Sequence, residues 1–102
     1  MTLTEAYEHM FQILLNYWLK SNKMSRDLGE MLSEFNTKTF KDRKPADPAA
    51  WEDWVDAVRK ITPNDDISEE QTGKSMIELL KEYNSHQGFD LKDVIDYFDQ
   101  KG

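Results

Sequence analysis

The sequence predicts an all-α domain of five helices, and three observations lead to this fold class. Apolar residues recur three and four positions apart along the chain, which is the spacing of one helix face. No stretch alternates apolar and polar residues for long enough to indicate a strand. Residues typical of helix N-caps precede the apolar stripes. At 102 residues the chain has the usual length of a domain, so we expect a single bundle-like domain over residues 1–102.

The first predicted helix spans residues 3–20. Its apolar stripe consists of Leu3, Tyr7, Met10, Phe11, Leu14 and Trp18. Thr2 followed by Glu5 has the form of a capping box, in which each side chain binds the backbone N–H of the other residue. A shorter second helix follows, with Ser25 as its N-cap. Its stripe is Leu28, Met31, Leu32 and Phe35.

Residues 36–46 have no apolar periodicity and predict a loop before the third helix. We expect the third helix to begin at Asp47 and Pro48, because Asp is a good N-cap and Pro fits the first helical position. It should end before Pro63. Its expected buried stripe is Trp51, Trp54, Val55, Val58 and Ile61, whereas Glu52, Asp53, Asp56 and Lys60 are expected to face away.

The last two helices follow a second capping box, formed by Ser68 and Gln71. The stripe of the fourth helix is Met76, Leu79, Leu80 and Tyr83, and residues 84–88 interrupt it. Phe89 and Asp90 are predicted to act as hydrophobic staple and N-cap of the fifth helix. The stripe of that helix is Leu91, Val94, Ile95 and Phe98.

The first two helices resemble the last two in layout. Asp27-Leu28 with Phe35 corresponds to Asp90-Leu91 with Phe98 at nearly the same spacing. Two interpretations stay open. The chain contains either two similar helical hairpins on either side of a central Trp-rich helix, or only the pattern that amphipathic helices share.

Acidic charge is concentrated towards the C-terminal end of the chain. Residues 1–61 contain ten Asp and Glu against nine Lys and Arg, whereas residues 62–102 contain ten against four. Most of the formal net charge of −7 therefore belongs to residues 62–102. This imbalance favours a basic partner and argues against direct binding of nucleic acid or anionic lipid.

The composition predicts a cytoplasmic protein. The sequence has no Cys, which excludes disulfides and thiolate metal sites and suits a reducing compartment. Its first residues lack a basic leader, so we expect no signal peptide. Its apolar runs are too short for a membrane span.

No motif for catalysis, a cofactor or a metal stands out. The only histidines, His9 and His86, cannot be grouped with the further ligands that a metal site needs. The acidic run over residues 64–70 lacks the central Gly and the closing Glu of an EF-hand loop. The glycines are scattered singly, and no nucleophile is grouped with a base. We therefore expect no enzyme activity, no cofactor and no bound metal.

A small basic cluster lies in the predicted loop. It consists of Lys38, Lys41, Arg43 and Lys44, with Phe40 among them. This cluster either contacts nucleic acid or is a solvated segment that pairs with the acidic helices. The overall acidic charge favours the second interpretation.

The candidate partner-binding residues lie on the exposed sides of the last two helices and in the loop before them. They are Asp65, Asp66, Glu69, Glu70, Glu78, Glu82, Asp93, Asp96 and Tyr97. Capping and the helix dipole explain part of the cluster over residues 65–70. Lys74 and Lys81 dilute the charge of the fourth helix. The outer face of the fifth helix therefore has the charge most in need of a partner.

Part of the sequence resembles a known family. The run Pro45-Ala46-Asp47-Pro48-Ala49-Ala50-Trp51-Glu52-Asp53-Trp54 is distinctive, and Leu3-Thr4-Glu5-Ala6-Tyr7-Glu8 and Asp27-Leu28-Gly29 accompany it. Together they resemble small acidic bacterial immunity proteins of polymorphic toxin systems, including contact-dependent growth inhibition. The resemblance covers roughly residues 3–61. It implies a cytosolic antidote that binds and neutralises one cognate toxin, often a nuclease.

The resemblance carries over no contact residue, because such families diverge at the binding surface. The acidic face is therefore a prediction from charge alone. The alternative interpretation is a non-enzymatic regulatory adaptor that binds a host protein through an apolar groove between helices.

Overall fold

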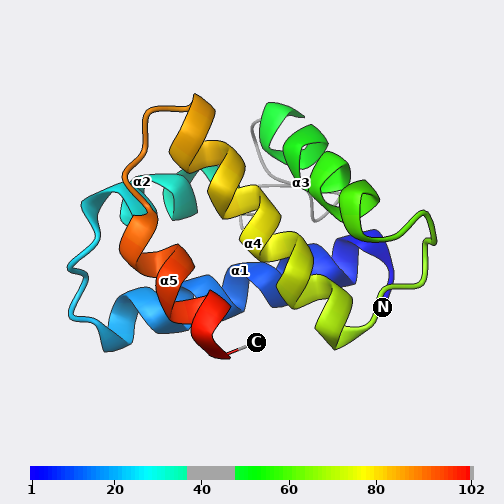
Figure 1. Cartoon of the computed structure of the whole chain (residues 1–102), viewed down its shortest axis with the longest axis horizontal. Helices are drawn as coiled ribbons and strands as arrows, with labels where there is room; N and C mark the ends of the chain where they lie inside the picture. Colours follow the sequence, from blue (N-terminus) through cyan, green and yellow to red (C-terminus); the bar gives the residue numbers. More distant parts are fainter. Residues whose placement is uncertain (37–47, 102) are drawn as a thin grey trace.

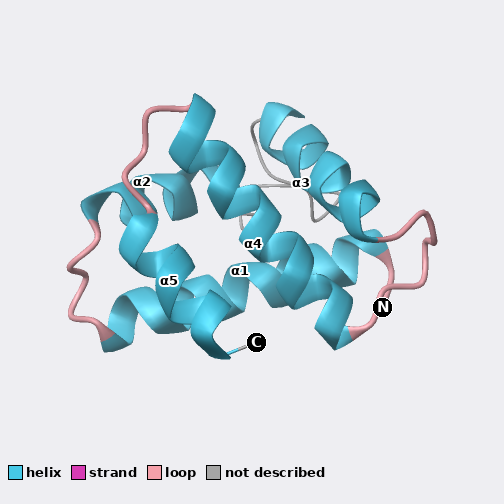
Figure 2. Cartoon of the chain, in the orientation of Figure 1, coloured by secondary structure: helices cyan, strands magenta, loops and turns pink. Residues whose placement is uncertain are grey.

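The computed structural model describes residues 1–36 and 48–101, and five α-helices make up most of them (Figure 1). The helices are α1 (Leu3–Lys20), α2 (Arg26–Phe35), α3 (Pro48–Ile61), α4 (Glu69–His86) and α5 (Lys92–Lys101). The described residues contain no strand (Figure 2). The all-α prediction is confirmed. The predicted N-cap Asp47 and the basic cluster of residues 38–44 lie outside the described residues.

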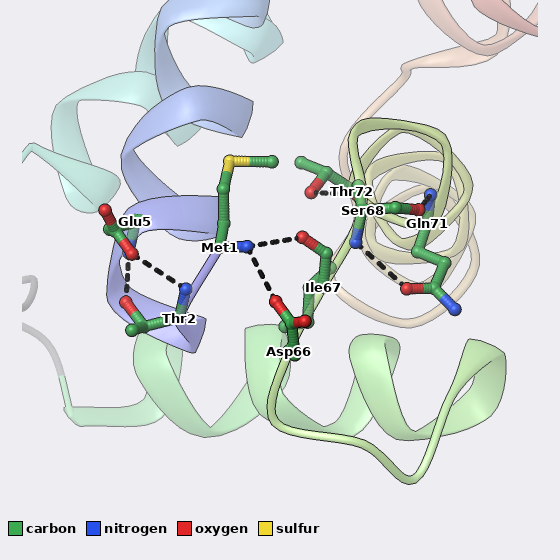
Figure 3. Close-up of polar contacts among 8 residues, drawn as sticks. All are labelled: Met1, Thr2, Glu5, Asp66, Ile67, Ser68, Gln71 and Thr72. Carbon is green, nitrogen blue, oxygen red and sulfur yellow. Dashed lines mark hydrogen bonds and ion pairs between the residues drawn. The ribbon is translucent and has the colours of Figure 1, made fainter.

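Capping boxes begin α1 and α4 as the sequence predicts (Figure 3). The Thr2 hydroxyl accepts a hydrogen bond from the backbone N–H of Glu5 at 3.1 Å, and the Glu5 carboxylate accepts one from that of Thr2 at 2.9 Å. Ser68 and Gln71 form the same reciprocal pair at 3.1 and 3.0 Å. These bonds satisfy N–H groups that have no partner within the helix, so they fix where each helix starts.

The α1–α2 hairpin turns through two residues in the left-handed region, Asn22 at φ 58° and Lys23 at φ 59°. Ser25 caps α2, as predicted. Its backbone carbonyl also accepts a hydrogen bond from the indole Nε1 of Trp18 at 2.9 Å. A Cβ on Gly29 would lie 2.8 Å from Cζ2 of the same ring. The two helices can therefore approach this closely only because residue 29 has no side chain.

The N-terminal segment pairs with the loop before α4 (Figure 3). Met1 and Ile67 exchange two hydrogen bonds, each with a donor–acceptor distance of 2.8 Å. Asp66 Oδ1 lies 3.1 Å from the Met1 nitrogen. Ile67 is buried, so this pairing closes the core near the start of α4.

The central helix is α4, which packs against α1, α3 and α5. Figure 1 shows α3 and α5 on opposite sides of α4, with α1 crossing behind it. The Trp-rich helix α3 packs mainly against α4 and less against α2, so it contacts one helix of each predicted hairpin. The pairs α1–α2 and α4–α5 do pack as neighbours, as the two predicted hairpins require. Their origin by duplication stays a prediction.

Two buried hydroxyl side chains help to explain why α4 can occupy the centre. Thr72 and Ser75 are fully buried between the helices. Thr72 donates to the Ser68 carbonyl at 2.9 Å, and Ser75 donates to the Gln71 carbonyl at 2.7 Å. Because each hydroxyl is satisfied within its own helix, burial leaves no donor unpaired. The buried surface of α4 is thereby wider than its apolar stripe.

Helix α5 begins at Lys92, one residue later than an Asp90 N-cap predicts. The backbone N–H of Asp90 donates to Asp27 Oδ2 at 2.6 Å, and that of Leu91 donates to Asn84 Oδ1 at 2.8 Å. Contacts with α2 and α4 therefore determine the path of the chain into α5. None of the helices in the described residues has the length and apolarity needed to cross a membrane.

Candidate partner-binding surface

The acidic residues predicted on α5 are exposed. Asp93 and Asp96 lie on the solvent side of this helix, whereas Leu91, just before it, and Val94 are buried against the core. The spacing of the apolar residues thus predicts the exposed face correctly. Asp93, Asp96 and Tyr97 are called the α5 face below.

Tyr97 is only partly available, because 39% of its surface is exposed. Its ring centroid lies 4.7 Å from that of Tyr17 on α1 and 5.0 Å from that of Phe98. Tyr97 therefore presents an edge of a packed aromatic cluster. Such rigid aromatic groups are common at the centres of protein interfaces.

A cleft of about 430 Å³ lies between the α1–α2 turn and the start of α5. Three carboxylates line it, those of Asp27, Asp90 and Asp93, together with one cation, Arg26, which pairs with Glu30 at 3.9 Å. The three acidic residues are called the acidic cleft below. Tyr17 and Met24 add apolar surface, and the side chain of Met24 is 83% exposed. The backbone N–H of Asp90 holds the Asp27 carboxylate in place. The cleft therefore combines negative charge with apolar walls.

The sequence predicts Asp90 only as an N-cap and assigns Asp27 no role in binding. The matching Asp-Leu pairs at residues 27–28 and 90–91 are the one feature of the sequence that links the two positions. The two positions come together because α2 and α5 begin side by side at this end of the molecule.

Glu78 and Glu82 lie in a different place, a groove of about 240 Å³ between α3 and α4. The groove is lined by Asp53, Asp56, Ala57, Lys60, Glu78 and Glu82. Glu82 pairs with Lys60 at 3.8 Å and lies 3.9 Å from His86. The expectation that Asp53 faces away is wrong, because its carboxylate is half-buried and accepts a hydrogen bond from the Tyr83 hydroxyl at 2.8 Å. Contacts within the chain therefore already engage the carboxylates of Glu82 and Asp53 in this groove.

Three acidic residues at the start of α4 and in the loop before it also have internal partners. Asp65 forms an ion pair with Arg59, and Asp66 pairs with the Met1 nitrogen at 3.1 Å. Glu70 pairs with Lys74 at 3.5 Å. Exposed pairs of this kind add little stability, yet each lowers the local negative charge that a partner meets.

Glu69 and Glu70 stand beside a further groove, of about 250 Å³, between α4 and α5. Gly73, Met76, Ile77 and Phe98 contribute to its lining, and so does one cation, Lys74. This is called the α4–α5 groove below.

The candidate residues thus do not form one continuous site. In the described part of the chain, no Lys or Arg forms an ion pair with the carboxylates of the acidic cleft or with Asp96. The acidic cleft and the α5 face meet at Asp93, which belongs to both. Among the described residues, no three His, Cys, Asp or Glu side chains are grouped in a way that could hold a metal ion.

Comparison of the chain with protein-family models, with curated proteins and with solved structures finds no match. The resemblance to immunity proteins therefore stays a prediction from the sequence.

Proposed function

We propose that this protein is a non-enzymatic, cytoplasmic binding domain that neutralises a basic protein partner, in the manner of the immunity proteins that its sequence resembles. One observation carries the proposal. The carboxylates of the acidic cleft and of the α5 face form no ion pair within the described residues, whereas Asp65, Asp66 and Glu70 do. Four carboxylates without an ion pair in the described residues, those of Asp27, Asp90, Asp93 and Asp96, thus lie together around the start of α5.

A nuclease domain is the partner class that this surface suits best. Nuclease active sites are basic because they bind phosphate, so carboxylates can occupy the place of the substrate. Charge of opposite sign also accelerates association over distances of about 10 Å at moderate salt. The apolar walls at Tyr17 and Met24 would then add short-range contacts.

The partner is tested with a toxin domain encoded next to the gene for this protein. Co-expression should abolish the toxicity of that domain, and the two chains should co-purify. If the toxin domain remains toxic and elutes separately, the assignment to immunity fails.

The surface is tested with the double substitution Asp93→Lys and Asp96→Lys. We expect the association rate with the toxin domain to fall by about tenfold or more at low salt, with a smaller change at high salt. Both side chains are exposed, so the fold should be retained. An unchanged association rate would show that the α5 face is not the binding surface.

A matched control makes the same change in net charge on α3. Glu52→Lys with Asp56→Lys alters two exposed acids on the far side of α4 from α5 (Figure 1). This control should slow association much less. If both double substitutions slowed association equally, the association rate would depend on the net charge of the protein rather than on the α5 face.

A regulatory adaptor remains the second candidate, because the α4–α5 groove offers apolar surface between helices. Docking into such a groove should weaken little between low and physiological salt, whereas binding through the α5 face should weaken strongly. Affinity measured at both salt concentrations separates the two candidates.

A further inference from the structure

The α4–α5 groove contains a glycine that the packing of the described residues does not require. Gly73 lies inside α4, where Gly destabilises a helix by about 0.5–1 kcal/mol relative to Ala. A Cβ on Gly73 would meet no atom within 4 Å. Gly29 differs, because a Cβ there would lie 2.8 Å from the Trp18 ring. The lack of a side chain at residue 73 therefore leaves open space at the surface of α4.

That open space continues an apolar groove with an acidic end. Ile77 and Phe98 line the groove and are half-buried. Glu69 and Glu70 lie one helical turn before Gly73 and are exposed. Glu70 pairs with Lys74 at 3.5 Å, whereas Glu69 forms no ion pair in the part of the chain that the structure describes. An apolar group that enters here would have a carboxylate beside it.

We propose that the α4–α5 groove receives an apolar side chain from an amphipathic, lysine- or arginine-containing segment of the partner, whose cationic group lies against Glu69. Charge complementarity selects this occupant, because the groove is lined by two carboxylates and one ammonium group, and the pairing of Glu70 with Lys74 leaves Glu69 as the charge that a cation can meet. The open surface at Gly73 allows the backbone of the segment to approach α4 closely. This inference rests on the proposed function, since it concerns the same basic partner.

The groove and the α5 face would contribute differently to binding. Long-range attraction by exposed carboxylates acts mainly on the association rate. An apolar side chain held in a groove acts mainly on the dissociation rate and depends little on salt. Substitutions in the groove and on the α5 face should therefore have separable kinetic effects.

The probe for the groove is a capped synthetic peptide, helical and amphipathic, with leucines on one face and lysines on the other. Backbone amide shifts of the protein, followed by NMR during titration, should change most at Gly73, Ile77 and Phe98. A peptide with Ala in place of Leu should lose these changes. A peptide with Glu in place of Lys should bind about tenfold more weakly or worse.

Substitutions at residue 73 provide the matched test. Gly73→Leu fills the groove and should weaken binding of the lysine peptide by about tenfold, whereas Gly73→Ala should change it by less than about threefold. Both variants should melt at or above the temperature of the parent protein, because the site has room for a side chain. Ile77→Gln, which alters the groove wall, is a second variant with the same expected loss.

Two results would overturn the proposal: amide shifts confined to the outer side of α5, or unchanged peptide binding by both Gly73→Leu and Ile77→Gln. Its failure is distinguishable from failure of the proposed function. If Asp93→Lys with Asp96→Lys slows association with the toxin domain while the groove variants bind normally, the α5 face is correct and the groove is wrong. If the groove variants alone lose binding, the α5 face is wrong.

Discussion

Tyr7 is a polar side chain at the centre of the aromatic core. Its ring lies 5.8 Å from that of Phe35, 5.8 Å from that of Trp51 and 6.1 Å from that of Trp54, measured between centroids. Its hydroxyl donates to the Phe35 carbonyl at 2.6 Å. Burial, and to a lesser degree the neighbouring Tyr83, raises the pKa of the Tyr7 phenol far above its ordinary value. The neutral phenol is therefore part of the folded structure.

We expect Tyr7→Phe to lower the free energy of unfolding by about 1–2 kcal/mol at neutral pH, because the buried Phe35 carbonyl loses its donor. The raised pKa adds a pH dependence. The contribution of Tyr7 is complete below its unfolded pKa of about 10 and is lost as the pH rises further, since only the unfolded chain then ionises this group.

Urea denaturation at neutral pH and above pH ~10 measures both effects. The parent protein should lose more stability between the two conditions than Tyr7→Phe does. Equal losses would show that Tyr7 does not contribute to the alkaline instability.

Among the helices, the boundaries follow from local hydrogen bonds, whereas the distances between helices follow from single side chains. Thr2, Ser25 and Ser68 cap the helices that the sequence assigns to them. The close contact of α1 and α2, by contrast, depends on Gly29 beside the Trp18 ring. Nothing in the periodicity of either helix indicates this contact, because it joins two separate elements.

Gly29→Ala tests the contact between α1 and α2. Helix propensity alone would make this change stabilising by about 0.5–1 kcal/mol. We expect destabilisation by about 1–3 kcal/mol instead, because the new Cβ collides with a ring that a hydrogen bond to Ser25 holds in place. Gly73→Ala is the matched control and should stabilise the protein. Chemical denaturation of both variants gives the comparison, and a gain in stability at both positions would contradict it.

Considered as a whole, the molecule has one core. Buried apolar residues from all the helices and from the loop before α4 form a single cluster. The radius of gyration, 12.6 Å, agrees with the value of about 13 Å expected for a folded domain of this length. Because α4 contacts three other helices, most of the packing between helices depends on it.

We therefore expect cooperative, two-state unfolding. Circular dichroism at helix wavelengths reports all five helices, whereas tryptophan fluorescence reports α1 and α3 through Trp18, Trp51 and Trp54. The two signals should give the same midpoint during denaturation. Separate midpoints would indicate that the α1–α2 and α4–α5 hairpins unfold independently.

Apolar periodicity and capping residues by themselves determined the five helices and the exposed acids of α5, because both depend on residues within about a turn of one another. Tertiary structure decided how the helices pack and which residues meet between them. It placed α4 at the centre, where Thr72 and Ser75 are buried with their hydroxyls satisfied within the helix. It also brought Asp27 to Asp90, 63 positions away along the chain, and so formed the acidic cleft. Contacts over such separations depend on how helices pack, and the pattern within each helix does not contain that information.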